Sequence, residues 1–305
     1  MASKAFDTVP HDILSSKLSH YGIRDLALKW FKSYLSDRGH YLKIKDCSSE
    51  IDKVEFGVPQ GSILGPILFL IYINDFSKCH DAISFNYADD KAIIKSGTNT
   101  ETLYEATNSE LNKIYNWLLA SKLSLNAAKS SYMIISNKRN IAKHNLYIND
   151  FPIKEVNEIK FLGLTLDNKL TFKSHIKHVS SKVAKITYII YRIKTCVPSN
   201  ILLQLYNTLA YPHMNYNITV WGSACETTLM PLIVQQKRLI RLLCGSQHYL
   251  SHTSPMFKEL KLLKLNDIYK FNISIYMYRI LKGEAPGMIV TEIDKNQNQH
   301  SHATR

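Results

Sequence analysis

A strand, a two-acid turn and a second strand are encoded between residues 83 and 94, and this pattern constrains the local fold strongly. Apolar and polar residues alternate from Ile83 to Tyr87, Ala88-Asp89-Asp90 follow, and an apolar run resumes at Ala92. Alternation before a short turn and an apolar run after it predict a β-hairpin. Paired carboxylates at the tip suit a divalent cation. They also suit an ordinary solvated turn, because Asp tolerates turn geometry.

Four further strings surround this hairpin in a fixed order. The chain opens with Ser3-Lys4-Ala5-Phe6-Asp7, and Gly57-Val58-Pro59-Gln60-Gly61-Ser62 precedes an apolar run from Ile67 to Ile73. Downstream lie the string from Lys122 to Ser130 and then Lys160-Phe161-Leu162-Gly163-Leu164. In this order and at these intervals, the motifs resemble the palm of reverse transcriptases, most closely those of jockey-like non-LTR retrotransposons.

This resemblance extends to about residue 285 and implies an α+β fold. Residues 1–167 would form a partial polymerase palm, with a small antiparallel sheet and packed helices, lacking the fingers and the start of the first catalytic motif. Residues 168–290 would form an all-helical basic thumb and C-terminal helices, followed by a polar tail at 291–305. Trp221-Gly222 and the run from His252 to Leu265 favour the retrotransposon branch.

The resemblance also implies roles for individual residues. Asp89 and Asp90 would bind metal and take part in catalysis, and Lys129 would approach the triphosphate. Phe6, Gln60 and Gly61 would contact the nucleotide, with Phe6 beneath its sugar. Phe161, Leu162 and Gly163 would form the primer grip. Several of these residues also have a simpler structural interpretation. Phe6 could be an ordinary core residue, and Gln60 and Gly61 could belong to a plain loop-to-helix connection. Lys129 could be a solvated surface charge, and Gly163 a simple strand glycine.

Nucleotidyl transfer of this kind uses two divalent ions, Mg²⁺ with Mn²⁺ possible, held by carboxylates from two strands. The family's second carboxylate sits two residues before the Ser3 string, where this chain has Met1. Asp7 lies six residues beyond Met1, roughly 20 Å along a strand at about 3.3 Å per residue. It is better explained as a turn or helix-start residue. The expected function is therefore RNA-directed DNA polymerase by family, with this chain expected to be an inactive fragment.

Charge supports a nucleic-acid partner, because the net charge of +13 attracts polyanions. No Asp or Glu occurs from Asn168 to Cys225. Within this segment, apolar residues recur at spacings of three and four, which predicts an amphipathic helix: Ile176, Val179, Val183, Ile186, Ile190 and Ile193. Its opposite face carries Lys173, Lys177, Lys185 and Arg192, predicted to contact a template–primer duplex. A solvated helix face is the alternative.

Other predicted helices begin near Pro10 and Arg24, open at Gly65-Pro66, and span about 101–119, 200–210, 226–244, 255–260 and 265–282. Strands are predicted twice within 41–56 and near 132–135, 146–148 and 159–166, with a turn at Asn149-Asp150. The subdomain boundary is placed near Asp167.

Composition limits the kinds of protein that this chain could be. With 305 residues and 45% apolar content, the chain can bury one large core or two modest ones. Its five cysteines form no C-x-x-C pair and are interpreted as buried thiols. No apolar run is long enough to span a bilayer, so an intracellular protein of the nucleus or cytoplasm is expected, with an RNA template, a DNA primer and dNTPs as partners and no membrane.

Two alternatives remain open. One is a degenerate element remnant that at most binds nucleic acid. The other is an intron maturase-like reverse transcriptase, which usually adds a basic splicing domain that is not recognisable here.

Overall fold

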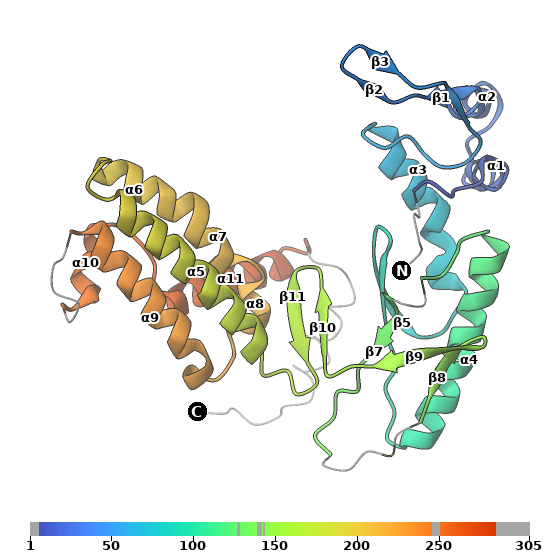
Figure 1. Cartoon of the computed structure of the whole chain (residues 1–305). Coiled ribbons are helices and arrows are strands. Elements are labelled where there is room, and N and C mark those ends of the chain that lie inside the picture. The colour runs from blue at the N-terminus through green and yellow to red at the C-terminus, as the bar shows by residue number, and fades with distance from the viewer. Residues whose placement is uncertain (1–5, 127–128, 139–141, 143, 246–250, 285–305) are drawn as a thin grey trace. The chain divides into compact units, whose positions relative to one another are not determined.

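The computed structural model describes residues 6–126, 129–138, 142, 144–245 and 251–284 (Figure 1). The chain divides into two compact units, residues 1–156 and 157–305. The division falls between Val156 and Asn157, ten residues before Asp167, and the hairpin that contains Phe161 to Leu164 lies in the second unit.

The first unit combines helices with short strands. Its helices are α1 (His11–His20), α2 (Asp25–Leu35), α3 (Leu64–Ile73), the 3₁₀ helix η1 (Asn74–Lys78) and α4 (Thr100–Ala120). Its strands are β1 (Arg38–His40), β2 (Lys43–Ile44), β3 (Cys47–Ser48), β4 (Asp52–Val54), β5 (Ile83–Tyr87), β6 (Asp90–Ile94), β7 (Ser131–Tyr132), β8 (Leu146–Ile148) and β9 (Phe151–Glu155).

The helices of this unit share one core. Leu14 and Leu18, four residues apart on α1, are completely buried, and Leu68 and Phe69 of α3 are 1% exposed. They cluster with Ile114 and Leu118 of α4, which confirms the helices predicted from these spacings. The side chain of Asn99 caps α4 by accepting a hydrogen bond from the Glu101 amide at 2.9 Å.

The strands form several small pieces instead of one antiparallel sheet. Pairs β1–β4 and β2–β3 are nested. The region predicted as two strands within 41–56 therefore holds three short strands, β2, β3 and β4, and β1 precedes it. β9 lies between β8, its antiparallel partner, and β7, its parallel partner. The turn predicted at Asn149-Asp150 joins β8 to β9, with Ile148 paired to Phe151. The predicted mixture of helices and strands is confirmed, whereas the sheet is partly parallel.

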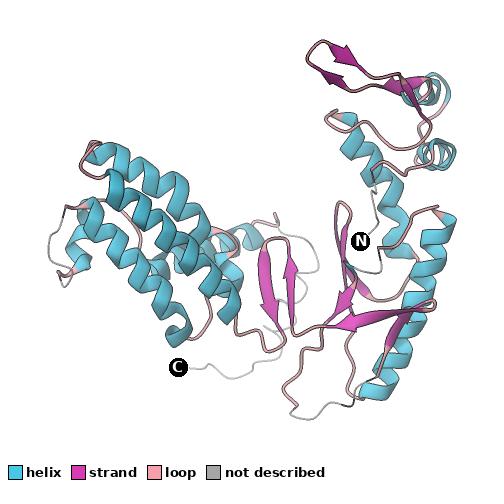
Figure 2. Ribbon diagram, in the orientation of Figure 1, coloured by secondary structure: helices cyan, strands magenta, loops and turns pink. Residues whose placement is uncertain are grey.

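The second unit is helical apart from one hairpin among the residues described (Figure 2). The hairpin is β10 (Glu158–Phe161) and β11 (Leu164–Asp167). The helices are α5 (Lys173–Ile193), α6 (Ser199–Leu205), the π-helical turn η3 (Tyr206–Ala210), α7 (Tyr211–Asn215), α8 (Ile218–Trp221), α9 (Glu226–Leu243), α10 (Thr253–Glu259) and α11 (Leu265–Leu281).

The apolar stripe of α5 organises the core of this unit. Ile176, Val183 and Ile190 are at most 1% exposed and pack in one cluster with residues of α9, such as Leu232 and Leu239. The long helix predicted from this stripe is therefore confirmed. The predicted polar tail, 291–305, lies outside the described residues.

The prediction of buried cysteines is wrong. Cys47, Cys196 and Cys225 are exposed, and Cys79 and Cys244 are only partly buried. The exposed thiols lie on short surface elements or at helix ends: Cys47 is in β3, Cys196 follows α5, and Cys225 precedes α9. Apolar character alone does not bury a side chain at such positions.

Within the described part of the chain, no helix has both the length and the apolar character needed to cross a membrane.

Candidate functional site

The two acids lie at a tight turn with unusual backbone geometry. Tyr87 pairs with Asp90 in the β5–β6 ladder, so Ala88 and Asp89 form a two-residue turn. Ala88 has φ +50°. Positive φ matches the twist of a tight hairpin but is favourable mainly for Gly. Such residues cost on the order of 1–3 kcal/mol and cluster at functional sites, which makes this turn a candidate site on structural grounds.

Asp89 and Asp90 are both partly buried, and neither carboxylate makes a hydrogen bond or ion pair in the described structure. Their four oxygens are the ligand type that Mg²⁺ prefers. No group of three His, Cys, Asp or Glu side chains able to hold a metal occurs among the residues described. Asp89 and Asp90 could supply carboxylate ligands to a divalent ion from this hairpin, and no third side chain of these types joins them in the described part of the chain.

Glu110 on α4 tethers both ends of this hairpin. Its Oε2 accepts a hydrogen bond from the Asp81 amide at 2.8 Å, just before β5, and its Oε1 lies 3.4 Å from Lys95 Nζ, just after β6. Glu110 is only 6% exposed. The Asp81 amide, helped by the charges of Lys113 and Lys95, holds the pKa of the Glu110 carboxyl below its ordinary value despite its desolvation. Sequence reasoning missed Glu110, although a charge beside the apolar residues Leu111 and Ile114 was a usable signal.

Lys91 directly follows the acids and was also missed. Its ammonium is buried without a hydrogen-bond partner and lies 4.0 Å from the centroid of the Phe76 ring. Burial lowers the pKa of this ammonium to about 8. The attraction between this cation and the aromatic face offsets part of the free-energy cost of removing the ammonium from water.

The chain opening and the glycine-rich loop lie against each other. The Val58 amide donates to the Phe6 carbonyl and the Gly57 amide to the Val9 carbonyl, both at 2.8 Å. A Cβ on Gly57 would lie 2.8 Å from the Phe6 carbonyl oxygen, and one on Gly65 would lie 2.2 Å from the Pro59 carbonyl oxygen. Both glycines are therefore required by close backbone approach.

These contacts bring the predicted nucleotide residues together. Gln60 Nε2 donates to Asp7 Oδ1 at 2.7 Å, and the Phe6 ring stacks on Phe69 with centroids 4.2 Å apart. Phe6 is only partly buried, while space beside Gly61 is open. Asp7 thus engages Gln60, as expected of a turn residue.

Lys129 is exposed, and its amide donates to Asn126 Oδ1 at 3.2 Å. Its ammonium makes no ion pair in the part of the chain described, so the structure does not join it to Asp89 or Asp90. The neighbouring residues 127 and 128 lie outside that part.

The predicted grip is the tip of the β10–β11 hairpin. Phe161 pairs with Leu164, and the turn residues Leu162 and Gly163 have φ +45° and +81°. Two successive positive φ values are typical of a type I′ turn, which strains Leu162. Tyr216 supports this turn, because its hydroxyl donates to the Leu162 carbonyl at 2.6 Å.

Tyr216 is in turn fixed by the core. Its carbonyl accepts a hydrogen bond from Trp221 Nε1 at 2.9 Å, and Trp221 is completely buried. No local sequence signal could have paired Tyr216 with Leu162, because the two residues are 54 positions apart.

The four predicted cations of α5, which are Lys173, Lys177, Lys185 and Arg192, are all exposed and make no ion pair within the described structure. Asp167 fixes the start of this helix: its carboxylate accepts the amides of Lys169, Thr171 and Phe172 at 3.1, 3.0 and 2.6 Å. Burial acts to raise the pKa of Asp167, but these hydrogen bonds hold it below its ordinary value.

Comparison with known proteins gives a consistent family. Residues 2–166 match the model of "Reverse transcriptase (RNA-dependent DNA polymerase)". The chain is 27% identical over 289 residues to the probable RNA-directed DNA polymerase from transposon X-element of Drosophila melanogaster, covering 91% of this chain and 31% of that protein.

It is likewise 27% identical to the RNA-directed DNA polymerases from mobile element jockey. The match covers 91% of this chain and 31% of the Drosophila melanogaster protein, and 87% and 30% for Drosophila funebris. The chain thus spans about a third of the length of these relatives.

Proposed function

The chain belongs to the reverse transcriptase family, in its jockey-like non-LTR branch, and we propose that it supplies the palm and thumb of an RNA-directed DNA polymerase. Its substrates would be dNTPs and its partners an RNA template with a DNA primer. The observation that carries this proposal is the pair Asp89 and Asp90 on a strained turn tethered by Glu110.

Asp89 and Asp90 would hold the divalent ions, Mg²⁺ with Mn²⁺ as a substitute, from one side. When bound, such ions lower the pKa of the primer hydroxyl and neutralise the triphosphate. The resemblance places the opposing carboxylate at the position that Met1 holds in this sequence.

The loop from Gly57 to Ser62 and the chain opening would hold the nucleotide. The partly exposed Phe6 ring, backed by Phe69, would fill the space of a ribose 2′-hydroxyl, and open space at Gly61 would admit the nucleotide. Gln60, oriented by Asp7, keeps its carbonyl oxygen available for a base or sugar edge. Exposed Lys129 would approach the triphosphate.

The second unit would hold the primer and the duplex. Phe161, Leu162 and Gly163 would contact the primer backbone at the hairpin tip, and Tyr216 would keep that tip in position. Lys173, Lys177, Lys185 and Arg192 would contact phosphates without sequence specificity.

Primer extension tests the catalytic assignment. The chain is extended with the upstream segment of a jockey relative, including Asp at position 1, and assayed on an RNA template with Mg²⁺. We expect dNTP incorporation that Asp89→Asn abolishes and Asp46→Asn, an exposed acid of another turn, leaves intact. Incorporation that survives Asp89→Asn would show that another residue holds the ions.

A nucleic-acid-binding remnant is the second candidate. The exposed cations of α5 favour it, because they require no metal site. It predicts duplex binding by residues 1–305 and no polymerisation by the extended chain.

A further inference from the structure

Helix α11 carries apolar side chains on two faces. Leu265, Ile268 and Ile280 are at most 6% exposed, and the helix packs against α7 and α8. A second apolar row, the outer stripe, has spacings of four, three and three residues: Phe271, Ile275, Tyr278 and Leu281. These four side chains are 38% to 79% exposed. Because a helix that is apolar all round is normally buried on all sides, the outer stripe indicates a contact surface.

Opposite charges stand at the two ends of the outer stripe. Asp267 lies one turn before Phe271, and Lys282 lies one turn beyond Tyr278, with its Nζ 5.7 Å from the centroid of that ring. Asp267 and Lys282 make no ion pair among the residues described. An acidic partner would be repelled at one end and a basic partner at the other. An acid, an apolar row and a cation in this order are complementary to the same order read in reverse.

We propose that two copies of this chain associate through antiparallel α11 helices. In such a pair, the positions that face each other have numbers with a constant sum. With the twofold axis beside Ser274, Phe271 faces Tyr278 of the second copy, and Asp267 faces Lys282 of the second copy. Each of these contacts occurs twice, because a twofold interface uses the same surface of both copies. This inference goes beyond the proposed function and does not depend on it.

Two further cations of this region do not oppose the pairing. At about 100° per residue, Lys270 and Arg279 fall on opposite edges of the outer stripe. In an antiparallel pair with twofold symmetry, each edge meets the same edge of the other copy. Lys270 of one copy is therefore kept away from Arg279 of the other.

The size of the outer stripe predicts a weak dimer. A standard stable interface removes about 800 Å² of surface from each partner. A buried aromatic side chain contributes roughly 150–250 Å², and the stripe has only two aromatic and two aliphatic side chains, all partly covered already. Association should therefore be reversible and visible at micromolar concentrations.

Sedimentation equilibrium of the whole 305-residue chain, over the micromolar range, tests the proposal. A reductant is present, because three cysteines are exposed and could join chains by disulfides: Cys47, Cys196 and Cys225. The mean mass should rise from that of one chain toward that of two and no further, since a twofold contact is closed.

Substitution of the outer stripe should prevent this association. Phe271→Asp with Tyr278→Asp should weaken it by at least about tenfold, because carboxylates would be buried in the contact. Tyr188→Asp with Tyr191→Asp is the matched control, since it changes two exposed aromatic side chains of α5 in the same unit. The control should associate as the parent does.

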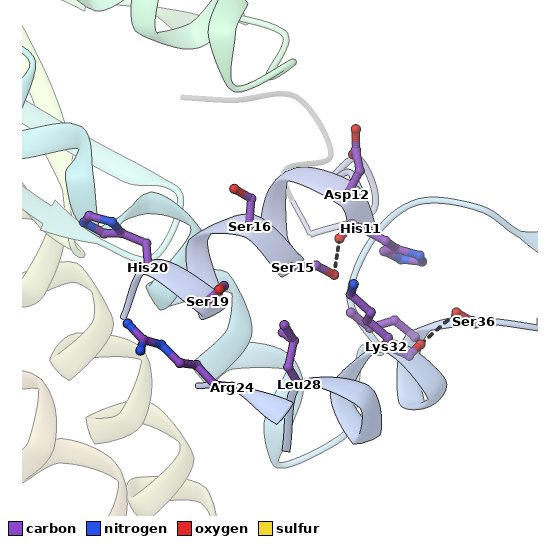
Figure 3. A pocket seen from close by; sticks show the side chains of 11 residues that line it. His11, Asp12, Ser15, Ser16, Ser19, His20, Arg24, Leu28, Lys32 and Ser36 are labelled. Atoms are coloured by element: carbon purple, nitrogen blue, oxygen red, sulfur yellow. Dashed lines mark hydrogen bonds between the residues drawn. The ribbon is translucent and has the colours of Figure 1, made fainter. Parts of the chain in front are cut away.

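Charge reversal identifies a second copy as the occupant. Asp267→Lys and Lys282→Asp should each weaken self-association by about tenfold, because each places like charges opposite each other at two symmetric contacts. An equimolar mixture of the two variants should restore association, because opposite charges then face each other between the different chains. Lys32→Asp should have no effect. It reverses an exposed cation that lines an open groove beside α1 and α2 in the first unit (Figure 3).

Three outcomes would overturn the proposal: a monomer over the whole range, an equal loss in a control variant, or a mixture that does not restore association. A monomer would show that the outer stripe is covered within the chain or by a different protein. The stripe and charge variants are independent, and circular dichroism of each is compared with that of the parent. Failure of the proposed function would appear in primer extension and duplex binding, which do not measure this mass.

Discussion

The two units carry their proposed functional residues on elements of opposite kind. In the second unit, α5 provides both the core stripe and the cations, since Val183 and Ile190 are completely buried while Lys185 and Arg192 are exposed. In the first unit, Asp89 and Asp90 sit on a two-stranded hairpin, and the apolar side chains of its strand β5 remain exposed: Ile83, Phe85 and Tyr87 are 49%, 47% and 65% exposed.

In the second unit, the residues proposed to bind nucleic acid are separate from those that stabilise the fold. In the first unit, the position of the proposed metal-binding acids depends on contacts that also stabilise the fold. An isolated two-stranded hairpin is marginally stable, so the position of the acids depends on tethers such as Glu110. A long helix with a buried stripe keeps its place without its charged face. Substitutions should therefore differ in how much stability they remove. The loss should be largest for residues that tether hairpins and turns, and smallest for surface residues of α5.

The largest loss is expected for Glu110→Ala. Removing a buried acceptor of charge-assisted hydrogen bonds should lower the free energy of unfolding of the first unit by about 2–3 kcal/mol. Amide hydrogen exchange in β5 and β6 should accelerate, because both ends of the hairpin lose their tether. Glu105→Ala, at an exposed position of the same helix, is the control. Equal effects of the two substitutions would show that the hairpin needs no tether.

A smaller loss is expected for Asp167→Asn at the start of α5. Loss of the charged acceptor should cost the second unit about 1–2 kcal/mol in free energy of unfolding. The folded-state pKa of Asp167 lies below the ordinary value for an aspartate. Its contribution is thus present above that value and is lost as pH falls through the folded pKa.

Urea unfolding at neutral pH and at stepwise lower pH measures this contribution. The difference between the parent and Asp167→Asn should shrink below about pH 4. Glu259→Gln, an exposed carboxylate of the same unit, should show no comparable difference. A gap that is constant with pH would place the effect in packing and not in the charge.

Tyr216→Phe should cost about 1 kcal/mol, the usual net value of one hydrogen bond. The ring stays, so the loss isolates the bond from the hydroxyl to the Leu162 carbonyl. Hydrogen exchange at the β10–β11 turn should accelerate. Tyr188→Phe, on the exposed side of α5, should change neither quantity. An unaffected turn in Tyr216→Phe would mean that its strain is supported elsewhere.

The same contrast explains what the sequence could predict. The stripe from Ile176 to Ile190 repeats over several turns, so α5 and its outward cations followed from spacing alone. Alternation predicted the β5–β6 hairpin but not that the apolar face of β5 would remain exposed. That depends on which elements cover it, and periodicity does not report neighbours.

Contacts between residues far apart in the chain were also not predicted from the sequence. Glu110 with Asp81, and Tyr216 with Leu162, join positions 29 and 54 residues apart. Neither pair leaves a local pattern. The resemblance of motifs placed Phe6 and Gln60 in one site, and the structure adds the hydrogen bond between Gln60 and Asp7 as a connection.

The smallest effect on stability, with a large effect on binding, is expected for Lys177→Gln, Lys185→Gln and Arg192→Gln together. These side chains are exposed and unpaired within the described structure, so the free energy of unfolding should change by less than about 0.5 kcal/mol. Each phosphate contact contributes about 0.9 to the slope of log K against log salt on duplex DNA. Hybrid or DNA duplex binding should therefore lose roughly 2–3 units of slope. Lys237→Gln, on α9, provides a single-charge comparison in the same unit. A triple variant that binds duplex with the parental slope would rule out the proposed nucleic-acid role of α5. A triple variant that unfolds would show that the charged face of α5 also stabilises the unit.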